Sequence, residues 1–103
     1  MIHVVAIITT KPGLRDTVLA AFRENLAAVR AENGCIEYIP VVDAEDAPAN
    51  LAKAGPDSFL VIEKWSDAEA LKAHAASAHM AAYVARVKDH LASRTVYVLG
   101  SAE

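Results

Sequence analysis

The spacing of apolar positions changes along the chain and divides it into predicted elements. Residues 2–10 are rich in Val, Ile and Thr, which is typical of a strand. Residues 14–32 instead carry apolar side chains at steps of four, four and three, with charged residues between them. That spacing predicts an amphipathic helix. Asn33-Gly34 ends it, because glycine can adopt the left-handed conformation that follows many helices.

The middle of the chain predicts two more strands. They cover residues 35–43 and 58–65, and a loop over residues 44–57 with two prolines and a glycine separates them. Pro40 cannot donate a ladder hydrogen bond, so its strand should lie at a sheet edge or carry a bulge there.

The C-terminal part predicts two helical segments and a last strand. Residues 66–69 read Ser-Asp-Ala-Glu, which fits a capping box opened by the serine, and a helix then runs to about Ala75. Ser77 can cap a renewed helix that runs to about Leu91. Residues 94–99 predict a strand, and a short tail follows.

The resulting order, βαββαβ, predicts a ferredoxin-like α+β sandwich. Residues 1–103 would form a single domain with a four-stranded antiparallel sheet and helices on one face. The strands are apolar on both faces: in residues 2–10, both Val4 and its neighbour Val5 are apolar. Since the helices can cover only one face, we expect the other to pack against a second copy, which gives a homodimer.

Composition narrows the class of protein. The chain has 103 residues, 54% of them apolar, and a net charge of −3, which gives no electrostatic basis for binding nucleic acid or an anionic membrane. Its apolar runs are far shorter than a membrane span, and its first residues lack the pattern of a signal peptide. A single cysteine cannot form an intrachain disulfide. A cytoplasmic setting is expected on these grounds.

Candidate catalytic residues crowd together in residues 58–83. His79 would lie in the first turn of a helix, where the dipole favours the uncharged imidazole that a general base requires, or it is an exposed histidine or part of the helix cap. His74 is the alternative base, or a histidine of the core or dimer interface. Trp65 has an indole N–H that could orient a substrate oxygen, or it could simply pack in the core.

Further candidates would bind substrate. Tyr83 follows His79 by four residues and shares its helical face, so the two could line one pocket wall or pack together. Tyr38 and Glu37 are adjacent on a strand, so one of them must meet a buried face. His3 could reach the dimer interface or a cavity.

Other motif classes are absent from the sequence. There is no phosphate loop, dinucleotide fingerprint, nucleophile elbow or zinc-type histidine pair. Any chemistry is therefore expected to use neither a metal nor a nucleotide cofactor.

The chain resembles the antibiotic biosynthesis monooxygenase family, the small dimeric α–β barrel proteins that include quinol monooxygenases. The residues that carry the resemblance are Lys11-Pro12-Gly13, Gly34-Cys35, Tyr38, Glu63-Lys64-Trp65, Ala70-Leu71, His74 and Ser77-Ala78-His79. The resemblance implies a homodimer with a cavity between sheet and helices in each subunit. It also implies cofactor-independent oxygenation of a quinol or another electron-rich aromatic by O₂, or, in other branches, haem degradation or isomerisation of small hydroxyketones.

Two alternatives remain beside the oxygenase. One is an isomerase that uses the same base, and the other is a ligand-binding dimer without catalysis. The haem-degrading branch carries an iron-ligating histidine close to where this chain has Tyr83 and Val84, so the sequence departs from that branch.

Overall fold

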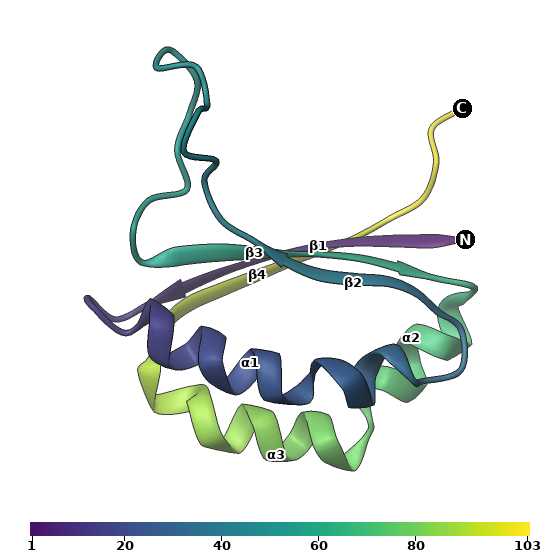
Figure 1. Cartoon of the computed structure of the whole chain (residues 1–103). Coiled ribbons are helices and arrows are strands. Elements are labelled where there is room, and N and C mark those ends of the chain that lie inside the picture. The colour runs from purple at the N-terminus through teal and green to yellow at the C-terminus, as the bar shows by residue number, and fades with distance from the viewer.

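The computed structural model describes all residues 1–103. Its strands form one four-stranded antiparallel sheet. The strands lie in the order β2-β3-β1-β4. The elements are β1 (Ile2–Thr10), α1 (Arg15–Arg30), β2 (Cys35–Val41), β3 (Ser58–Trp65), α2 (Ala68–Ala75), α3 (Ala78–Val87), a 3₁₀ turn η1 (Lys88–His90) and β4 (Leu91–Leu99). The helices all lie on one side of the sheet (Figure 1). This arrangement confirms the predicted ferredoxin-like sandwich.

The face toward the helices holds the core. Along β1 the side chains alternate between buried and half-buried, and Val4, Ala6 and Ile8 point inward. The matching positions of β3, Phe59 and Val61, are almost fully buried beside them. Burial on this one face is the main stabilising contribution, because apolar area leaves water.

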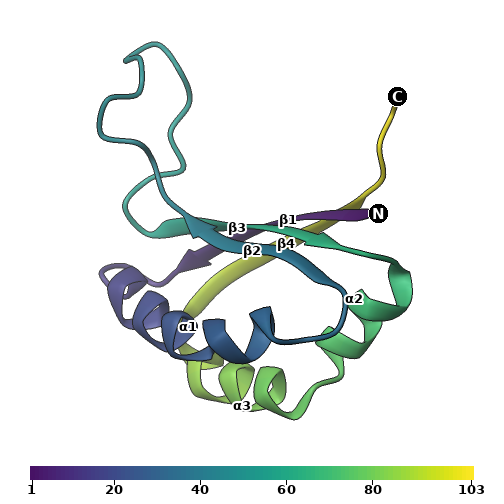
Figure 2. The same cartoon turned by 45° about the vertical axis from the view of Figure 1, so that its right-hand side comes forward.

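The opposite face of the sheet is apolar but uncovered. On β1 and β3 it carries half-buried Val5, Ile7 and Ile62, and toward the sheet's two edges it carries exposed Ile39 and Tyr97. The loop after β2 and the C-terminal tail both rise on this side, away from the helices (Figure 2). We call this surface, Val5, Ile7, Ile39, Ile62 and Tyr97, the open face.

Several local predictions need correction. Asp67, and not Ser66, caps α2, since its carboxylate accepts a hydrogen bond from the amide of Ala70 at 2.8 Å. The last helix ends at Val87 and the last strand begins at Leu91, because Leu91 pairs with Thr10 and the intervening 3₁₀ turn reverses the chain.

Other local predictions agree with the structure. Ser77 caps α3 through a hydrogen bond from the amide of Met80. Strand β2, with Pro40, lies at the sheet edge, and the register irregularity is between Cys35 and Glu37. No helix combines the length and the apolar character needed to cross a membrane.

Candidate active site

A cavity of about 650 Å³ lies between α2, α3 and the helix-facing side of β1, β3 and β4. It exists because the helices cover β1 but not β4: Val4 is 2% exposed, whereas its partner on β4, Val98, is 58% exposed. The volume is in the range of small-molecule sites. The lining is mostly apolar: Val4, Leu71, Ala75, Met80, Ala81, Val84, Ala85, Val96 and Val98, with four polar residues, Glu63, His74, Lys88 and Arg94.

His74 is the imidazole of this cavity. It comes from α2 and is 5% exposed. Its Nδ1 lies 2.8 Å from Oε2 of Glu32, and its other nitrogen, Nε2, has no hydrogen-bond partner within the chain. A carboxylate at Nδ1 orients the ring and fixes the tautomer with its proton on Nδ1, which leaves Nε2 as an acceptor.

Two aromatic rings hold the His74 ring in place from behind. Its centroid is 4.6 Å from that of Trp65 and 5.4 Å from that of Tyr38, and Tyr38 in turn stacks on Phe22 at 5.3 Å. Trp65 is fully buried and Tyr38 is 5% exposed. Burial raises the pKa of the Tyr38 hydroxyl far above its ordinary value. Neither ring lines the cavity.

Glu63 is the carboxyl group of the cavity. Its Oε1 accepts a 2.9 Å hydrogen bond from Nε1 of Trp65, and the side chain is 7% exposed. Burial raises the pKa of Glu63 above its ordinary value, although the Trp65 hydrogen bond and the charges of His74 and Arg94 act in the opposite direction. A perturbed carboxyl next to an oriented imidazole is typical of catalytic sites.

The residues predicted from the sequence do not all meet in this cavity. His74 lines it, but the indole N–H of Trp65 is already donated to Glu63, so Trp65 cannot orient a substrate oxygen without breaking that bond. His3 pairs with Lys64 and Leu99 and points to the open face. It therefore lies on the other side of the sheet from the cavity.

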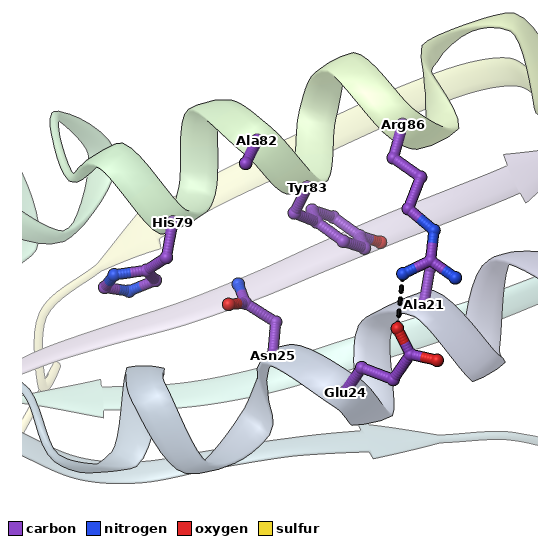
Figure 3. Close-up of a pocket in the computed structure, with 7 residues that line it drawn as sticks. All are labelled: Ala21, Glu24, Asn25, His79, Ala82, Tyr83 and Arg86. Carbon is purple, nitrogen blue, oxygen red and sulfur yellow. Dashed lines mark hydrogen bonds and ion pairs between the residues drawn. The ribbon is translucent and has the colours of Figure 1, made fainter.

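His79 and Tyr83 lie together in a second, smaller pocket. It is a groove of about 250 Å³ between α1 and α3, and Figure 3 shows both side chains there, with Asn25 facing them. At its far end Arg86 pairs with Glu24. Burial raises the pKa of Tyr83 to about 12. The predicted shared face of the two residues is confirmed, but their groove is not the large cavity.

Sequence reasoning did not single out Glu32 and Arg94. Glu32 precedes the turn at Gly34 and is 42 residues from His74, so no local spacing links the two. Glu63 and Trp65 are two residues apart on β3 and face the same side of the sheet, where the indole N–H of Trp65 donates to the Glu63 carboxylate. No group of three or more His, Cys, Asp or Glu side chains is arranged to hold a metal ion.

Known proteins with similar sequences and structures show which family the chain resembles. A family model described as antibiotic biosynthesis monooxygenase matches residues 1–86. A protein of Escherichia coli (strain K12) named "Probable quinol monooxygenase YgiN" is 36% identical over 101 residues, 96% of each chain. A crystal structure of an antibiotic biosynthesis monooxygenase has a TM-score of 0.82 at 31% identity and covers 100% of both chains. PA3566 from Pseudomonas aeruginosa has a TM-score of 0.81 at 25% identity, with 99% of this chain and 94% of the other covered. These matches confirm the resemblance predicted from the sequence motifs.

Proposed function

The chain belongs to the antibiotic biosynthesis monooxygenase family, and on that premise we propose that it oxygenates a quinol or another electron-rich aromatic with O₂ and without a bound cofactor. The observation that carries the proposal is His74. Its ring lines an apolar cavity, a carboxylate orients it through Nδ1, and Nε2 has no partner within the chain. The similar E. coli protein, named "Probable quinol monooxygenase YgiN", supports the choice of substrate class.

The first step is deprotonation of the substrate. Nε2 of His74 takes the proton of a phenolic hydroxyl, and the guanidinium of Arg94, on the β4 wall, stabilises the phenolate. Of the two candidate bases, only His74 lines the cavity, whereas His79 lies in the groove, so we assign the base to His74. The electron-rich phenolate can then transfer electrons directly to O₂.

The overall reaction balances without another reductant. A hydroquinone and O₂ give a hydroxyquinone and water. One oxygen atom is inserted at a ring carbon, the other leaves as water with two hydrogens from the substrate, and the substrate supplies all the electrons. The apolar walls, such as Leu71 and Met80, exclude water from the reactive intermediate.

An oxygen electrode tests the proposal. Purified protein with a hydroquinone should consume one O₂ per quinone formed, at a rate proportional to protein concentration and above the autoxidation measured with heat-denatured protein.

An isomerase is the second candidate, because His74 and Glu63 line the same cavity and could move a proton beside a carbonyl. Turnover of a hydroxyketone without oxygen uptake would favour the isomerase and contradict the oxygenase.

A homodimer is part of the proposal. The open face is too apolar for a surface in contact with water, and a second copy that packs face to face would bury it. The native mass should therefore be about twice the 11.0 kDa of one chain.

Replacing Ile62 at the centre of the open face by aspartate should give a monomer, because the dimer would bury an unpaired charge. The matched control is Ala20→Asp on the exposed side of α1, which should stay dimeric. Light scattering coupled to size exclusion measures both masses. A monomeric wild-type chain, or a dimeric Ile62→Asp variant, would refute this packing.

A further inference from the structure

Two imidazoles approach the same carboxylate oxygen. Oε2 of Glu32 lies 2.8 Å from Nδ1 of His74 and 3.4 Å from Nε2 of His79. The exposed fraction of the side chains rises along this line, from 6% at His74 through 14% at Glu32 to 31% at His79. The three groups therefore form a row that leads from the buried wall of the cavity toward the surface.

The outer end of the row opens on a different pocket from the inner end. His74 lines the large cavity, whereas His79 lines the groove between α1 and α3. In Figure 3 the His79 ring lies at one end of this groove, next to Asn25 and apart from the Glu24–Arg86 pair. Ser77 contacts both histidines. Its hydroxyl donates a hydrogen bond to the carbonyl oxygen of His74 at 2.8 Å and lies 3.3 Å from Nε2 of His79.

We infer that Glu32 and His79 form a proton pathway that connects His74 in the cavity with solvent in the groove. The inference rests on the proposed function, which makes His74 the base. It adds two residues that do not touch substrate and that act through His74. Glu32 orients the ring and carries the proton onward, and His79 exchanges it with water.

Each transfer conserves protons. When Nε2 of His74 accepts a proton from the substrate, the proton on Nδ1 passes to Oε2 of Glu32. Glu32 hands it to Nε2 of His79, and His79 releases the proton on its other nitrogen to water in the groove. When the oxygen intermediate later takes the proton on Nε2 of His74, the row runs in reverse and Nδ1 is reprotonated from solvent.

The cavity gives a reason for such a pathway. Once an aromatic ligand fills it, the apolar lining leaves little water beside His74. Glu63 and Lys88 also line this cavity, so a proton passed to either of them stays beside the substrate. The row through Glu32 instead ends at His79 in the groove between α1 and α3.

Proton exchange at His74 tests the pathway without substrate. In protein labelled with ¹⁵N-histidine, the Nδ1 proton of His74 is expected to exchange rapidly with water in the wild type, which broadens its NMR signal. His79→Gln keeps the size and hydrogen-bonding capacity of the side chain but cannot carry a proton. It should slow the exchange at least about tenfold, by analogy with the loss of a general acid–base group. Free imidazole should restore the rate.

The control is His90→Gln, which replaces a histidine in η1, beyond the C-terminal end of α3, and should leave the exchange unchanged. Equal exchange rates in the wild type and His79→Gln would overturn the pathway. Because the exchange measurement needs no substrate, it tests the proton pathway independently of the proposed oxygenase function. Slowed exchange in His79→Gln without oxygen uptake by the wild type would support the pathway and refute the oxygenase. Oxygen uptake by the wild type, with equal exchange rates in the wild type and His79→Gln, would support the oxygenase and refute the pathway.

Discussion

Replacing His74 by glutamine is expected to lower kcat for quinol oxygenation by about 10²–10⁴-fold, the usual contribution of a general base. Glutamine can still hydrogen-bond to Glu32, so the fold should be retained, but it cannot accept the phenolic proton. KM should change little, since the apolar walls that bind the ring stay in place. The measurement is steady-state oxygen uptake against hydroquinone concentration.

Two comparisons make this prediction specific. His90→Gln removes a histidine outside the cavity and should keep wild-type kinetics. His79→Gln should fall between the two, because the residue acts through His74 and not on substrate. If His79→Gln lost as much activity as His74→Gln, or His74→Gln kept the wild-type rate, the assignment of the base to His74 would fail.

Replacing Gly34 by alanine is expected to destabilise the fold by about 3 kcal/mol. Gly34 has a φ of +84°, which costs an alanine on the order of 1–2 kcal/mol. A Cβ there would also lie 2.5 Å from Oγ of Ser66 and 2.6 Å from Cβ of Ala70, and overpacking of this kind costs about 1–3 kcal/mol. The melting temperature should fall by roughly 10–25 °C, since each kcal/mol is worth about 4–8 °C in a domain of this size.

Gly13→Ala is the matched control. Gly13 has a similar φ of +79°, but nothing lies within 4 Å of its added Cβ. It therefore reports the backbone cost alone, about 1–2 kcal/mol. Thermal unfolding followed by circular dichroism compares the two variants. Equal melting temperatures would show that the contact with α2 is not tight. The contact matters for the site because the carbonyl of Gly34 accepts a 2.8 Å hydrogen bond from the amide of Ser66, and Gly34 is two residues from Glu32, which hydrogen-bonds to His74.

The order of the elements could be predicted because it depends on local periodicity. Strand and helix spacing gave the βαββαβ order, and β3 begins and ends at the predicted residues. The end of α3 could not be predicted, because the pairing of Leu91 with Thr10 is a contact between distant parts of the chain. The bulge between Cys35 and Glu37 could not be predicted either, because it also depends on pairing between separate strands. It puts Cys35 opposite Trp65 and Tyr38 opposite Glu63, so both reach the helix-facing side although they are three residues apart.

The candidate site was predictable in its members but not in their arrangement. His74 and His79 were both recognisable as candidates, yet which of them reaches the cavity depends on the break between α2 and α3. Because the two residues lie on different helices, helical periodicity does not fix their relative direction. Glu32 and Arg94 contribute from distant segments, and only the folded chain brings them to His74 and Glu63.

Isotope labelling shows whether the protein inserts an oxygen atom of O₂ into its substrate. The protein should be incubated with a hydroquinone under ¹⁸O₂, and the product analysed by mass spectrometry after rapid quenching. For a quinol monooxygenase we expect one ¹⁸O atom in each hydroxyquinone formed and the other in water, at a rate that falls with His74→Gln. Product that carries no ¹⁸O, or labelling that is the same without the protein, would contradict the proposed oxygenation.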